Sequence, residues 1–230
     1  MTIAIDGPAA SGKTTVGKML ADQLGYLFLD TGCMYRAVTA AALQQDTNLE
    51  DEAAVTHIAQ TMQLEIASGA GYDDGRQYTV LLDGRDSTWE IRTPAVDANV
   101  SLVSSYLPVR QEMVRQQRAI GGKGGVVMVG RDIGTVVMPN APLKLYITAT
   151  AAERARRRLN DRQRQGQSGD YDHILADIIR RDEYDGSRTH SPMLPAADAL
   201  ILDSSDKPAA TLVADILAML ESLSASQPVS

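Results

Sequence analysis

An octapeptide near the N-terminus limits the folds open to this chain: Gly7-Pro-Ala-Ala-Ser-Gly-Lys-Thr14 satisfies the pattern GxxxxGK[ST]. An apolar run, Thr2–Asp6, precedes it, and apolar residues at helical spacing follow over Lys13–Leu24. The segment therefore predicts a strand, a glycine-rich loop and a helix. Such a loop lets backbone amides approach an anion, and the helix adds its positive N-terminal end. We expect the Lys13 ammonium to reach nucleotide phosphates and the Thr14 hydroxyl to hold Mg²⁺.

The rest of the chain alternates between strand-like and helix-like patterns. Four more buried strands are predicted, at Tyr26–Asp30, Gly125–Gly130, Leu143–Ala149 and Ala199–Asp203. Helical spacing is found over residues Met34–Leu43, 51–62, Thr93–Tyr106, Val109–Ile120, Ala151–Gln165, Tyr171–Asp185 and Pro208–Leu223, and Pro108 is expected to divide the third of these helices from the fourth. This alternation predicts an α/β fold with a parallel sheet and helices on both faces. Three short extended pieces predict a small antiparallel insert of hairpins, at Gln63–Ala67, Tyr78–Asp83 and Asp86–Trp89.

The composition fits one globular domain and argues against several classes of protein. The 230 residues are 44% hydrophobic and 22% charged, which excludes wholesale disorder. Aromatic residues make up only 4%, so a stacking platform for single-stranded nucleic acid is not expected. Cys33 is the single cysteine, which suits a reducing compartment. We find no signal-peptide pattern and no apolar run near 18 residues, so we expect a cytoplasmic protein without a membrane span.

The number and placement of charged residues bear on the kind of ligand. With 22 basic and 29 acidic side chains, the net charge of −7 argues against binding to nucleic-acid polymers or anionic membranes. Arginine nevertheless outnumbers lysine by 17 to 5, and nine arginines lie between Arg154 and Arg188. Arginine suits bidentate capture of phosphate, although a solvated helix face is an alternative for Arg154–Arg164. Surface charges are screened beyond about 8 Å, so single nucleotides remain possible ligands.

Three classes of nucleotide-using protein share the octapeptide pattern. A switch GTPase needs an Asn-Lys-x-Asp element, and no such string occurs. A motor ATPase has an apolar strand ending in an acid; Ala199–Asp203 has this form, but only 27 residues follow it, so we interpret it as the last strand of the sheet. A small-molecule kinase needs a second anion site that faces the first.

Two segments that follow predicted strands supply such a site. Asp30-Thr-Gly-Cys-Met-Tyr-Arg36 and Gly130-Arg-Asp-Ile-Gly-Thr135 leave the carboxyl edge of the sheet, where open α/β sheets bind ligands. We expect Thr31 and Arg36 to face the glycine-rich loop. An adjacent Arg131 and Asp132 can hold a phosphate and accept a hydrogen bond from an exocyclic amine, or else form a local ion pair.

Two arginine-rich helices complete this prediction. Arg154 and Arg158 lie one turn apart on one helix face, and Arg181, Asp185 and Arg188 recur at similar spacing on the next helix. The two helices are joined by the loop at residues 166–169. Together they predict a lid that closes over bound phosphates.

These motifs together resemble the bacterial cytidylate kinase family: GPAASGKTT, DTGCMYR, EIRT, GRDIGT, ERARRR and RRDEYDGSR. The resemblance runs from about residue 2 to 220. It implies one kinase domain over 1–224 with a five-stranded parallel sheet, and a reaction in which ATP phosphorylates CMP or dCMP with Mg²⁺. The implied parts are a core at about 1–35, 108–150 and 190–224, a monophosphate-binding insert at about 36–107 that carries the antiparallel sheet, a short helical lid at about 151–189, and a polar tail at 225–230.

The resemblance also implies residue roles. ATP phosphates would be bound by Gly7, Pro8, Ala9, Ala10, Ser11, Gly12, Lys13, Thr14 and Thr15, with Thr14 on the metal. CMP would be bound by Thr31, Arg36, Ser101, Arg110, Arg131, Asp132, Arg181, Asp185 and Arg188. Within this set, Ser101, Arg110 and Asp132 would read the cytosine edge. Catalysis would depend on Lys13, Arg131, Arg154, Arg158 and Arg188.

One position departs from the family pattern, because Val129 stands before Gly-Arg-Asp where relatives commonly carry an Asp that organises the metal. Thr14, Asp6 or water would then have to compensate. A UMP-type or shikimate-type kinase and a non-catalytic nucleotide-binding module remain alternatives. A monomer is the default expectation. Cys33 and the three histidines, His57, His173 and His190, receive no chemical role.

Overall fold

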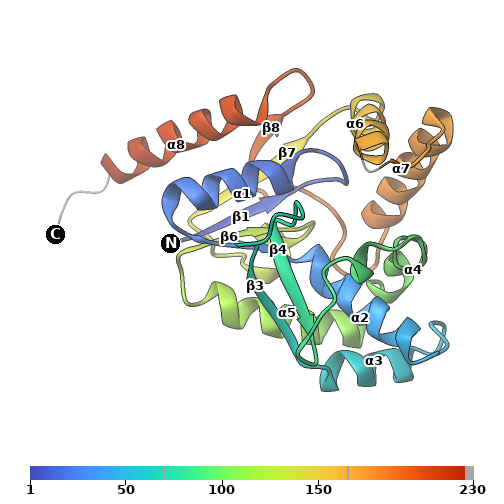
Figure 1. Cartoon of the computed structure of the whole chain (residues 1–230). Coiled ribbons are helices and arrows are strands. Elements are labelled where there is room, and N and C mark those ends of the chain that lie inside the picture. Colours follow the sequence, from blue (N-terminus) through green and yellow to red (C-terminus); the bar gives the residue numbers. More distant parts are fainter. Residues whose placement is uncertain (70, 165, 226–230) are drawn as a thin grey trace.

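The computed structural model describes residues 1–69, 71–164 and 166–225, and its central layer is a five-stranded parallel sheet (Figure 1). The strands are β1 (Thr2–Asp6), β2 (Leu27–Asp30), β6 (Val126–Val129), β7 (Leu143–Thr148) and β8 (Leu200–Asp203). They lie in the order β2-β6-β1-β7-β8. Because every neighbouring pair is parallel, the segments that follow the five strands leave from one edge of the sheet. The predicted fold class is confirmed.

Helices cover both faces of this sheet, which explains why its central strands are apolar on both sides. The helices are α1 (Lys13–Leu24), α2 (Gly32–Gln44), α3 (Glu52–Thr61), α4 (Pro94–Val103), α5 (Leu107–Gly121), α6 (Ala151–Arg164), α7 (Tyr171–Gly186) and α8 (Ala209–Ala225). Ile5 and Val129 belong to the buried cluster under α1 and α8, whereas Ala4 and Met128 belong to the cluster under α5. Helix α1 approaches the sheet closely at Gly17, where an added methyl group would lie 2.6 Å from Cγ2 of Val129.

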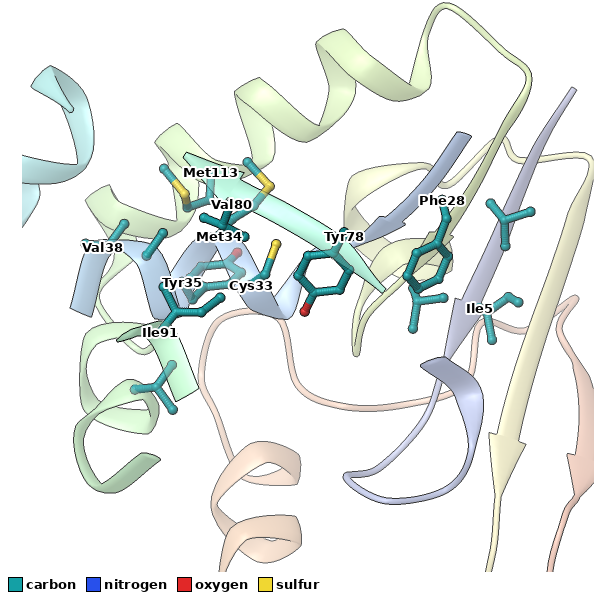
Figure 2. Packing of buried hydrophobic residues seen from close by; sticks show 14 of the residues in the cluster. Ile5, Phe28, Cys33, Met34, Tyr35, Val38, Tyr78, Val80, Ile91 and Met113 are labelled. Atoms are coloured by element: carbon teal, nitrogen blue, oxygen red, sulfur yellow. The ribbon is translucent and has the colours of Figure 1, made fainter. Parts of the chain in front are cut away.

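A three-stranded antiparallel sheet stands between β2 and α4 in the sequence, as predicted. It consists of β3 (Leu64–Ser68), β4 (Tyr78–Leu82) and β5 (Arg85–Asp86). Figure 2 shows Tyr78 of β4 between Phe28 of β2 and Cys33 of α2, and the Phe28 and Tyr78 ring centroids are 6.2 Å apart. The small sheet therefore shares one hydrophobic core with the parallel sheet.

Two local predictions were wrong, and one element was not predicted. The third extended piece, Asp86–Trp89, is not a strand: pairing ends at Asp86, and the chain turns into the 3-10 helix η1 (Glu90–Arg92). Pro108 does not separate two helices, because it occupies the first turn of α5, where its missing N–H costs nothing. The π-helical turn η2 (Ile133–Val137) was not foreseen. Gln165 and the tail residues 226–230 lie outside the described residues.

Helices α6 and α7 form a pair beside the carboxyl edge of the parallel sheet, with α4 below α7 in Figure 1. They pack on each other through a small cluster of their own, Ala155, Ile174 and Ile178. This cluster is separate from the two clusters of the parallel sheet, so the pair meets the rest of the fold mainly through polar contacts. Among the described residues, no helix has both the length and the hydropathy that a membrane crossing requires.

Candidate active site

The glycine-rich loop follows β1 and is shaped by its glycines. Gly7 and Gly12 have φ angles of 147° and 84°, and a Cβ on Gly7 would lie 2.0 Å from the carbonyl oxygen of Ile147. Lys13 begins α1, is buried, and donates from Nζ to the carbonyl oxygen of Pro8 at 2.8 Å. Burial, and next to it the positive charge of Arg131, lower the pKa of Lys13 to about 7. A phosphate at this loop would restore the charge of Lys13.

Two carboxylates flank the loop and differ in what they already bind. Asp6 is buried, and its two oxygens accept the backbone N–H groups of Ile133 and Gly134, each at 2.7 Å. Burial raises the pKa of Asp6 to about 6. Asp30 ends β2 and is partly exposed; its Oδ2 accepts a hydrogen bond from the Thr14 hydroxyl at 3.2 Å. Asp6 therefore holds the backbone of η2 in place, and Asp30 supports the threonine of the loop.

Three arginines converge on Asp185 in α7. The carboxylate of Asp185 is 1% exposed and lies 2.5 Å from Nε of Arg131, 2.6 Å from a guanidinium nitrogen of Arg188 and 3.9 Å from Nε of Arg181. Both Asp185 oxygens lack a partner in hydrogen-bond geometry, as do Nε of all three arginines. The nearby Arg131 charge, followed by burial, lowers the pKa of Arg181 to about 9. This cluster carries more positive charge than its one carboxylate balances, so it suits an anionic ligand.

A buried ion pair lies next to this cluster. Arg110 of α5 pairs with Asp132, and it also donates to the carbonyl oxygen of Ser104 at 3.0 Å. The hydroxyl of Ser104 accepts a hydrogen bond from Arg188 at 3.0 Å. Ser101, three residues before Ser104, is half-buried on α4, and its carbonyl oxygen accepts a hydrogen bond from the Ser104 hydroxyl at 3.2 Å. The predicted base-reading residues are thus gathered around the segment that joins α4 to α5.

Asp97 of α4 joins two predicted phosphate ligands from different parts of the chain. Its carboxylate lies 2.6 Å from Arg36 of α2 and 3.3 Å from Arg158 of α6. Arg36 also donates to the carbonyl oxygen of Ile91 at 3.1 Å. The contact connects the α6–α7 pair to the segment that carries the antiparallel sheet.

Two further arginines tie α6 to the phosphate-binding edge. Arg154 is buried; it pairs with Asp182 of α7 at 2.6 Å and donates to the carbonyl oxygen of Ala149 at 2.9 Å. Arg157 donates to the hydroxyl of Ser204 at 3.1 Å, and that hydroxyl donates to the carbonyl oxygen of Ser11 in the loop at 2.8 Å. The base of α6 is therefore anchored to the glycine-rich loop through side chains.

The structure brings the predicted residues to one edge of the sheet but pairs them differently from the simplest expectation. Arg131 and Asp132 do not form a local ion pair: Arg131 turns to Asp185 and Asp132 to Arg110. The Thr31 hydroxyl is buried and donates to the carbonyl oxygen of Val129 at 2.9 Å, so it is used within the fold.

Sequence reasoning missed three acidic partners: Asp30, Asp97 and Asp182. A local signal existed for two of them, because Asp97 precedes Ser101 by four residues on one helix face and Asp30 ends a predicted strand. Asp182 neighbours Arg181, but its pairing with Arg154 depends on how α6 and α7 pack.

A loop for the phosphates of one nucleotide, facing a cluster of arginines for a second anion, defines a P-loop kinase that phosphorylates a small molecule. No candidate nucleophile or general base of the Ser-His or Cys-His type accompanies these groups among the described residues, because Cys33 is buried and His57, His173 and His190 lie on other elements or in a loop.

Comparison with known sequences places the chain more narrowly. Residues 3–222 match the family profile of cytidylate kinase. A protein named cytidylate kinase from Chloroflexus aggregans is 50% identical over 201 residues, which cover 87% of this chain and 85% of that protein. The cytidylate kinase of Bacillus pumilus is 46% identical over 204 residues, covering 89% and 88%. The chain belongs to the cytidylate kinase family.

Among solved structures, an uncharacterized protein from Eubacterium ventriosum covers 96% of this chain and 99% of its own with a TM-score of 0.50 at 14% identity. That likeness concerns the fold alone.

Proposed function

We propose that the protein transfers the γ-phosphoryl group of ATP to CMP or dCMP, giving ADP and CDP or dCDP. It is an enzyme of the cytidylate kinase family. The observation that carries the proposal is the excess of partly buried guanidinium groups at Arg131, Arg181 and Arg188, on the same sheet edge as the glycine-rich loop. Neither a UMP-type or shikimate-type kinase nor a non-catalytic module is favoured by any observation.

The donor phosphates would lie on the loop from Gly7 to Thr15. Its left-handed glycines and the N-terminus of α1 direct amide N–H groups toward an anion. Lys13 would exchange its bond to the Pro8 carbonyl for a phosphate oxygen. Arg154 reaches the carbonyl oxygen of Ala9 at 3.4 Å, so it is at hand when a phosphate occupies the loop.

The acceptor would lie against α4, α5 and α7. We assign its phosphate to Arg36 and Arg131, with Arg188 assisting, and its ribose to Arg181 and Asp185. For the base, Asp132 would accept from the exocyclic amine, helped by Arg110 and Ser101. The ion pair between Arg110 and Asp132 supports this assignment, because a carboxylate paired with a guanidinium offers only hydrogen-bond acceptors, and cytosine offers an amine where uracil offers a carbonyl.

Magnesium fits the donor side of the site. The Thr14 hydroxyl and the Asp30 carboxylate are hard oxygen donors in mutual contact, both partly exposed. The described residues contain no cluster of three acidic, His or Cys side chains, which agrees with an ion held largely by phosphates and water. Bound Mg²⁺ would neutralise charge on the β- and γ-phosphate oxygens.

The mechanism needs no general base, because the attacking oxygen of a nucleoside monophosphate is already ionised near neutral pH. The chain's own task is to position two polyanions and to neutralise the charge that spreads over the transferring group. Arg158 is the arginine suited to that role, since it is partly exposed and its ion pair with Asp97 can be exchanged. An arginine so placed contributes on the order of 10³–10⁵ in rate.

The parts of the chain follow from this assignment. We propose that residues 151–189 act as a lid and that residues 36–107 act as the monophosphate-binding segment of a single kinase domain. A monomer, as the default state, and a cytoplasmic location complete the proposal; the location is supported by the single cysteine, Cys33, which is a free and buried thiol.

An ADP-release assay with CMP, dCMP, UMP, AMP and shikimate as acceptors tests the proposal. We expect turnover with CMP and dCMP far above that with the other three. A preference for another acceptor would overturn the assignment of the base site, and absence of turnover with all five would favour a binding module.

A further inference from the structure

The hydroxyl of Thr14 has one carboxylate partner among the described contacts, and that partner is Asp30. The donor of this hydrogen bond is the hydroxyl, so its proton points to Asp30 while its oxygen lone pairs stay free. The second oxygen of Asp30, Oδ1, accepts the N–H of Gly32 at 3.1 Å. Both ends of the carboxylate are therefore fixed, and its orientation is set before any ligand arrives.

Two other positions near Thr14 offer no free carboxylate. Both carboxylate oxygens of Asp6 accept hydrogen bonds from the N–H groups of Ile133 and Gly134, and the residue is 3% exposed. Val129 is the direct register neighbour of Asp30 on β6, and its side chain is carbon only and fully buried against Gly17. On this side of α1, Asp30 is the carboxylate that is both close to Thr14 and open to solvent.

We propose that Asp30 is the positioning residue of the magnesium site: it holds the Thr14 hydroxyl with its lone pairs toward the cation and accepts hydrogen bonds from water on the cation. The proposal rests on the proposed function, because it requires an ATP-bound divalent ion at Thr14. A hydrogen-bonded carboxylate behind a ligand fixes that ligand's orientation and raises its donor strength, and loss of such a partner typically lowers metal affinity 10- to 100-fold.

The alternative is that Asp30 serves only the local turn. A carboxylate that merely caps Gly32 would keep this function as an amide, because the Asn side-chain oxygen still accepts the N–H. Asp30→Asn therefore removes the charge and the support of Thr14 while leaving the turn its acceptor. Asp22→Asn is the matched control, since Asp22 is an exposed carboxylate on α1 paired with Lys18 at 2.5 Å.

The experiment measures how strongly the divalent ion and ATP bind together, in the absence of CMP. Calorimetry gives the dissociation constant of ATP in excess EDTA and in Mg²⁺, and Mn²⁺ titration followed by electron paramagnetic resonance gives the affinity of the ATP complex for the ion. We expect Asp30→Asn to weaken the affinity for Mn²⁺ 10- to 100-fold and to leave the affinity for metal-free ATP within about twofold of the wild type. Asp22→Asn should match the wild type in both measurements.

Unchanged Mn²⁺ affinity in Asp30→Asn would overturn the proposal, and so would an equal loss of metal-free ATP binding, which would mark a structural role in the loop. Thr14→Val supplies a second route should Asp30→Asn fold poorly. Thr14→Val should weaken the affinity of the ATP complex for Mn²⁺ to the same extent. The double variant should show no larger loss of Mn²⁺ affinity than either single variant, because the two residues act as a unit. Failure of the proposed function shows separately, as absence of phosphoryl transfer to CMP in the wild type.

Discussion

The low pKa of Lys13 predicts that the affinity for ATP depends steeply on pH. In the free protein this pKa is about 7, because the ammonium is buried and faces Arg131. A phosphate beside Lys13 favours the charged form, so the pKa rises on binding and the protein takes up a proton. A group of pKa 7 is about half protonated at pH 7 and about one hundredth protonated at pH 9. The apparent dissociation constant of ATP should therefore rise about 50-fold over this range, or about 2.3 kcal/mol.

Isothermal titration calorimetry at pH 7, 8 and 9, in two buffers of different ionisation enthalpy, measures both effects. We expect uptake of about half a proton at pH 7 and of nearly one at pH 9. Lys13→Met should bind ATP weakly, with little dependence on pH. Lys18→Met is the control, because Lys18 lies on the same helix and pairs with Asp22; it should keep the wild-type slope. A flat wild-type profile, or a slope that survives in Lys13→Met, would refute the reasoning.

Three further outcomes are expected. Arg158→Ala should lower kcat steeply, because the proposed role of this side chain is to neutralise charge on the transferring group. Its melting temperature should stay close to that of the wild type, because the side chain is partly exposed. A kcat equal to that of the wild type would remove Arg158 from the mechanism. Gly17→Ala should lower the free energy of unfolding by about 1–3 kcal/mol, because its methyl group would lie 2.6 Å from Val129. Adding Val129→Ala should recover part of this loss. If the changes in melting temperature of the two single variants simply add in the double variant, this contact is contradicted. Cys33 should react with a thiol reagent only on unfolding, because it is 1% exposed and burial raises the pKa of its thiol; fast labelling of the native protein would disprove the packing in Figure 2.

The sequence predicts this fold well because its strongest signals are local. The octapeptide pattern, the apolar strands and the helical spacing each depend on residues close together in the chain, and all five parallel strands were found where predicted. The turn η2 could not be predicted. Its N-terminal N–H groups are held by Asp6, 127 residues away from Ile133, and nothing in residues 133–137 signals that partner.

The candidate site was predictable by residue type but not by pairing. Arginines at the ends of strands and on one helix face predict an anion site whichever carboxylates they meet. Which carboxylates these are depends on tertiary distances: Arg131 reaches Asp185 across 54 residues, and Arg158 reaches Asp97 across 61. The hydrogen bond between Thr14 and Asp30 was missed for the same reason, since β2 and the glycine-rich loop meet only in the folded chain.

The arginine cluster around Asp185 also has a consequence for the charge of the ligand, because the proposed phosphate ligands Arg131 and Arg188 belong to it. Three partly buried guanidinium groups and one buried carboxylate leave two positive charges at this site. A phosphate monoester above its second pKa of about 6 carries two negative charges and brings this site to electroneutrality. A phosphodiester brings only one negative charge and a nucleoside none, so each would leave part of the positive charge of this site uncompensated. With the phosphate bound as proposed, charge matching would favour a free nucleoside monophosphate over the same nucleotide inside a polymer, independently of which base it carries.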